Sequence, residues 1–236
     1  MYAITPGAIA PGLAYRLGYV LLDLLWLAAG DLEPAIVRDL ITGVLAAPEY
    51  RINAGHFIED QLAGLGVRIV PALELIARIP ETDYSPNAMH AARAIAAVAA
   101  DHPGYADGIV AGLIAEGQDG QAIRAGLVIA GKIAIPVSIG RIWSIHLERR
   151  QAVAALPDDA DVHLRHDLSD RSRTSYRALK RAATGQSDWI EQRIAGTNDR
   201  LAAELLLEQL MEIEHGPAEA AWRRTKAQLF AAIPAG

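Results

Sequence analysis

Four side chains that can bind a metal ion or move a proton recur near the C-terminal end of the chain. They are Glu204, Glu208, Glu212 and His215. On a helix, residues three or four positions apart share a face, so these four form one stripe within about 80°. Carboxylate and imidazole groups can bind iron, manganese or zinc. The same stripe also suits the solvated face of an ordinary amphipathic helix, because leucines fill the rest of the segment.

The stripe ends in a Glu-x-x-His motif, Glu212 to His215, which resembles one half of the ferritin-like di-iron site. That family uses such a motif from each of two helices and a glutamate from each of two more. A second Glu-x-x-His motif is missing, and His56 and Glu59 have the reverse order. The resemblance implies a metal-dependent helical enzyme as one hypothesis, and the incomplete motif favours the solvated face.

A second polar cluster lies in the segment VHLRHDLSD, at residues 162–170. The side chains of His163, His166, Asp167 and Asp170 could together bind zinc or iron, or form an acid-base pair. The same residues are also typical of a helix start, where carboxylates favour the positive end of the helix dipole. The sequence alone does not decide between a ligand site and a helix start for these residues.

Trp143 stands beside Arg141 and His146, where the chain changes from small apolar residues to charged ones. Pockets for small ligands favour the interfaces between packed units. If the chain binds a small molecule, we predict the pocket near these three residues. Buried aromatic side chains are more often part of a core, which is the alternative.

Charge argues against a nucleic-acid-binding surface. The net charge is −6 and the sequence pI is about 5.6. A basic run follows residue 164, but neighbouring aspartates cancel much of its field, which predicts a solvated helix face with internal salt bridges. The run comprises Arg165, Arg171, Arg173, Arg177, Lys180 and Arg181. The chain has no cysteine, which excludes disulfides and thiolate metal sites and is compatible with the cytoplasm.

Apolar periodicity predicts helices along the whole chain. The hydrophobic fraction is 52% but the aromatic fraction is only 6%, so the core must consist of Ala, Leu, Ile and Val. Capping, proline and glycine signals place helix starts near Ala54, Ser85 and Gly120, with partner helices near Val70 and Tyr105. The predicted fold class is therefore all-α.

This spacing resembles a HEAT or armadillo-like repeat over residues 8–140. The resemblance implies an α-solenoid of helical hairpins whose surface binds another macromolecule. The longer, more charged helices of residues 141–236 predict a helical bundle region, with a loop at 156–168 between the two. We expect both regions to pack as one unit.

Three segments allow other interpretations. The apolar runs at 64–71 and 128–137 could be short buried strands of an α/β protein. Residues 13–31 are strongly hydrophobic, but Arg16 and Asp23 interrupt them and the uninterrupted part is shorter than the roughly 20 residues that a bilayer needs. They predict a buried first helix and no membrane span.

No complete catalytic set accompanies these patterns. The favoured hypothesis is a cytoplasmic, protein-binding helical scaffold with no predicted cofactor. A metal-dependent enzyme using iron, manganese or zinc and a small-molecule-binding protein are the alternatives.

Overall fold

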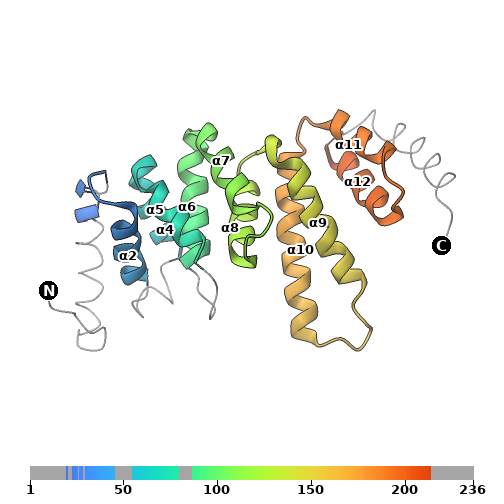
Figure 1. Cartoon of the computed structure of the whole chain (residues 1–236), viewed down its shortest axis with the longest axis horizontal. Coiled ribbons are helices and arrows are strands. Elements are labelled where there is room, and N and C mark those ends of the chain that lie inside the picture. The colour runs from blue at the N-terminus through green and yellow to red at the C-terminus, as the bar shows by residue number, and fades with distance from the viewer. Residues whose placement is uncertain are drawn as a thin grey trace. The chain divides into compact units, whose positions relative to one another are not determined.

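The computed structural model describes residues 20, 23–25, 27–28, 30–45, 55–79 and 87–213. In this part of the chain all regular elements are helices and no strand occurs, which confirms the all-α prediction (Figure 1). The chain forms two compact units, Met1–Ile129 and Ala130–Gly236.

The first unit is a succession of short helices. Residues 20, 23–25 and 27–28 are helical. Helix α2 packs on α5. Both α4 and α5 pack on α6, which in turn packs on α7. The bounds are α2 (Pro34–Leu45), α4 (Gly55–Gly64), η2 (Gly66–Ile69), α5 (Val70–Ala77), α6 (Asn87–Asp101), α7 (Pro103–Leu113) and α8 (Gly120–Ala130).

The predicted helix starts in this unit are confirmed to within two residues. The helices begin at Gly55, Asn87 and Gly120, with partners at Val70 and Pro103. Prolines occupy the first turns of α5 and α7, where a missing backbone N–H leaves no hydrogen bond unmade.

The strand alternative is wrong. Residues 64–71 contain the end of α4, the 3₁₀ turn η2 and the start of α5. Residues 128–137 contain the end of α8, a turn and the start of a second 3₁₀ turn, η3 (Pro136–Ser138). Pro71 and Pro136 each lie in the first turn of a helical element, where the fixed φ of proline favours helix.

Small residues let the helices of the first unit approach closely. Alanines make up most of the buried face of α6. Where α8 meets the end of α7, a Cβ atom at Gly126 would lie 2.6 Å from Ile114 Cγ2 and 3.0 Å from Leu113 Cβ. That position therefore has no room for a side chain.

The second unit is built on a helical hairpin. Two antiparallel helices, α9 (Ile139–Ala154) and α10 (Val162–Ala182), pack along each other (Figure 1). Two further helices follow, α11 (Ser187–Ala195) and α12 (Arg200–Ile213), and α12 packs on both α11 and α10.

One predicted boundary in the second unit is corrected by an aspartate cap. The loop predicted at 156–168 ends at Asp161, because its carboxylate accepts hydrogen bonds from the backbone N–H groups of His163 and Leu164 at 2.8 and 3.0 Å and starts α10 there. Asp199 caps α12 in the same way, through the N–H groups of Leu201 and Ala202.

None of the described helices combines the length and the hydropathy that crossing a bilayer requires.

Candidate functional site

His146 lies in a buried polar cluster between α9 and α10. It is 2% exposed, and its Nδ1 is 3.1 Å from Ser175 Oγ. Ser175 Oγ is also 2.8 Å from the carbonyl oxygen of Ser172 and 3.3 Å from that of Arg171. A hydroxyl has a single hydrogen, which here goes to a carbonyl, so we assign the imidazole hydrogen to Nδ1 as the donor to Ser175.

Burial keeps this imidazole neutral. Desolvation, together with the smaller effect of the positive charges of Arg150 and Arg149, lowers the pKa of His146 to about 4. A neutral histidine paired with a serine hydroxyl needs no counter-ion. The pair therefore joins the two helices of the hairpin without burying a net charge.

Aromatic rings surround the pair. The ring centroid of Trp143 is 6.4 Å from that of His146, and the ring centroid of Tyr176, on α10, is 6.1 Å from that of His146. Both rings are tilted relative to the imidazole. Trp143 is buried, while Arg141 is half-buried. The structure thus brings Trp143 and His146 together within the core of the second unit. Their predicted ligand-binding role stays a prediction.

The other predicted ligand cluster lies on the exposed first turns of α10. His163 and His166 are exposed, His166 Nδ1 is 3.6 Å from Asp170, and Asp167 pairs with Arg171 at 2.8 Å. His166 precedes Ser175 by nine residues, or about 13 Å along a helix. The two predicted clusters are therefore separate.

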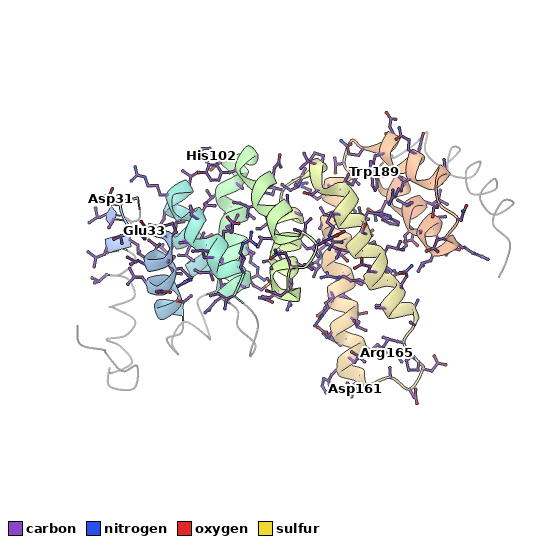
Figure 2. All side chains as sticks on the ribbon, in the orientation of Figure 1. Asp31, Glu33, His102, Asp161, Arg165 and Trp189 are labelled. Atoms are coloured by element: carbon purple, nitrogen blue, oxygen red, sulfur yellow. The ribbon has the colours of Figure 1, made fainter. Side chains whose placement is uncertain are left out.

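The tip of the hairpin is held by one arginine. Arg165 Nη2 donates to the carbonyl oxygens of Pro157 and Asp158 at 3.1 and 2.8 Å, and Asp161 caps the helix beside it (Figure 2). Much of the predicted basic run is likewise engaged inside the unit, because Arg171 and Arg173 pair with Asp167 and Asp170.

The predicted metal stripe lies on α12. Glu204 pairs with Arg200 at 3.1 Å and Glu208 is exposed, while the side chain of Glu212 and all of His215 lie outside the described residues. Among the residues that the structure describes, no group of three or more His, Cys, Asp or Glu side chains could hold a metal ion. The four-residue metal site stays a prediction.

One charged cluster was missed by the sequence analysis. Glu59 of α4 accepts a hydrogen bond from Arg93 at 2.7 Å and lies 3.0 Å from His90 Nδ1, both on α6. Desolvation acts to raise the pKa of Glu59, but hydrogen bonds and charge from Arg93 and His90 outweigh it and lower that pKa. Glu59 precedes His90 by 31 residues and Arg93 by 34. Only the packing of α4 on α6 therefore brings the three side chains together.

An exposed apolar stripe marks the first helical segment. Val20, Leu24 and Leu27 lie on one face within about 60°, and they are 52%, 52% and 75% exposed. Leu25, on another face, is buried. The prediction of a buried first helix is therefore wrong for these three positions.

Carboxylates border this apolar stripe. Asp23 lies on the same segment, and Figure 2 shows Asp31 and Glu33 at its junction with α2. All three are exposed, and none forms an ion pair with a described residue. We call Asp23, Asp31 and Glu33 the acidic rim.

Comparison with protein families, with characterised proteins and with solved structures finds no match for this chain.

Proposed function

We propose that this chain is a protein-binding helical module whose partner docks on the apolar stripe of Val20, Leu24 and Leu27. The observation that carries the proposal is the exposure of three large aliphatic side chains on one helical face. Exposed apolar residues are usually scattered singly, and contiguous ones mark interaction surfaces. Covering them removes apolar area from water, which favours association.

The spacing of helices in the first unit supports a scaffold of repeated hairpins. Starts at Gly55, Asn87 and Gly120 are 32 and 33 residues apart, and the partner helices at Val70 and Pro103 are also 33 apart. We infer a HEAT-like stack with a short repeat.

The chemistry of the polar clusters favours binding over catalysis. Glu59 is occupied by His90 and Arg93, and His146 by Ser175. An open row of aliphatic side chains gives a small ligand little of the enclosure that ligand pockets provide. A protein surface can cover such a row.

The proposal is tested by affinity capture from an extract of the source cells. The bait variant Leu24→Ser/Leu27→Ser removes the stripe, and the matched control Val162→Ser/Leu164→Ser removes two exposed aliphatic residues of the second unit. We expect the wild-type chain and the control to retain a protein that the stripe variant loses. The same set of bound proteins on all three baits would overturn the proposal.

A further inference from the structure

We infer that the partner segment is a basic amphipathic helix, an inference that rests on the proposed function. The apolar stripe has the spacing i, i+4, i+7, which is the pattern by which one helix packs lengthwise on another. A helical partner with leucine-like residues at the same spacing would cover Val20, Leu24 and Leu27 together.

The acidic rim favours a partner helix that carries positive charge. Asp23, Asp31 and Glu33 are exposed and form no ion pair with any described residue, whereas Asp39 of α2 is already paired with Arg38 at 2.7 Å. Among the described residues Arg68 lies close to Gly30, since a Cβ atom there would be 3.4 Å from Arg68 Cδ. Three carboxylates against that one arginine leave the border of the stripe negative.

This charge disfavours two other occupants. In a symmetric dimer of this chain through the stripe, both copies would bring an acidic rim to the interface region, and like charges across an interface oppose association. An anionic lipid surface would be repelled in the same way. Lysine and arginine residues flanking an apolar helical face complement the rim.

The test measures binding of two fluorescent peptides to the full chain by anisotropy. One is a leucine/lysine amphipathic helix of about 18 residues, long enough to form a helix, and the other has glutamate at every lysine position. We expect the lysine peptide to bind at least about tenfold more tightly at about 50 mM NaCl, and the difference to shrink at about 300 mM NaCl.

Two substitutions separate the roles of stripe and rim. Leu24→Ser/Leu27→Ser should weaken binding of the lysine peptide by about tenfold or more, because the apolar contact is lost. Asp31→Asn/Glu33→Gln should weaken it by roughly fivefold at low salt and much less at high salt. Both pairs are exposed, so the fold should tolerate them.

The second unit supplies matched controls, because Val162 and Leu164 are exposed beside Asp158 and Asp159. Val162→Ser/Leu164→Ser and Asp158→Asn/Asp159→Asn should leave binding unchanged, and equal losses in these controls would overturn both proposals.

Two further outcomes separate the inference from the proposed function. If the stripe variant weakens both peptides equally and the rim variant changes neither, the inference is overturned while the proposed function stands. Sedimentation that shows a dimer of the wild-type chain, lost in Leu24→Ser/Leu27→Ser, would overturn the inference in favour of a second copy.

Discussion

Each of the two units places a histidine at a helix–helix junction, and the two histidines have opposite kinds of partner. In the first unit His90 lies 3.0 Å from the Glu59 carboxylate, which Arg93 also contacts. In the second unit His146 faces the neutral hydroxyl of Ser175, with the charges of two arginines nearby. The same residue type thus takes part in a charged network in one unit and in a neutral pair in the other.

The difference follows from what each neighbouring helix offers. A buried carboxylate is tolerated where it has at least two charged or polar donors, as Glu59 has. A buried imidazole close to arginines is tolerated only in its neutral form, which is the form of His146 at neutral pH. The comparison predicts that acid destabilises the two junctions over different ranges of pH.

The largest effect should come from protonation of His146. Its folded pKa of about 4 lies below the unfolded value of 6.5, so the unfolded state takes up the proton first as the pH falls. Stability should decrease from pH 6.5 towards pH 4 by about 3 kcal/mol in total. Urea unfolding at a series of pH values measures this slope, and His146→Phe should remove it. An unchanged slope in that variant would contradict the assignment.

Removing the carboxylate of the first junction should have the next largest effect. Glu59→Ala leaves His90 and Arg93 without their partner and should cost about 2 kcal/mol. Because the folded pKa of Glu59 is lowered, its contribution is present above pH 4.5 and disappears as the pH falls through the folded pKa. The matched control is Glu74→Ala, which breaks a half-exposed pair with Arg78 and should cost about 0.5 kcal/mol. Equal losses of unfolding free energy in the two variants would show that Glu59 contributes no more than a residue of an ordinary surface ion pair.

A smaller effect is expected at the neutral junction. Ser175→Ala removes the acceptor of His146 Nδ1 and should cost about 1 kcal/mol at neutral pH. In the background of His146→Phe the same substitution should cost less, because no buried donor is left unpaired. A double-mutant cycle by urea unfolding measures this coupling, and additivity of the two changes would contradict the hydrogen bond.

The smallest effect is expected on α12, away from both junctions. Glu208 is exposed, so Glu208→Ala should change stability by less than about 0.5 kcal/mol. We also expect it to leave the metal content of the purified protein unchanged by elemental analysis. Loss of bound iron, manganese or zinc in this variant would instead support the metal-enzyme hypothesis.

Helix type and helix starts could be predicted from the sequence because they depend on local signals. The prolines at the starts of α5 and α7 and the apolar spacing within α6 lie within a few residues of one another. The start of α10 was missed because Asp158, Asp159 and Asp161 are all suitable cap residues by type, and only the hydrogen bonds of Asp161 show which of them begins the helix.

The candidate surface and the Glu59 cluster depend on long-range packing. A hydrophobic segment such as 20–28 predicts burial, and its amino-acid types do not indicate that Val20, Leu24 and Leu27 are exposed. Glu59 and Arg93 are 34 residues apart, so no local pattern joins them. The neutral pair of His146 and Ser175 similarly appears only once α9 and α10 form their hairpin.

The most direct test of the protein-binding account is site-specific photo-crosslinking in an extract of the source cells. A photoreactive amino acid is placed at position 27, which is 75% exposed, and in a second protein at position 162, which is 69% exposed. The account predicts a discrete crosslinked product from position 27 that Leu24→Ser reduces, and none of the same mass from position 162. The same products from both positions, or none from position 27, would contradict it.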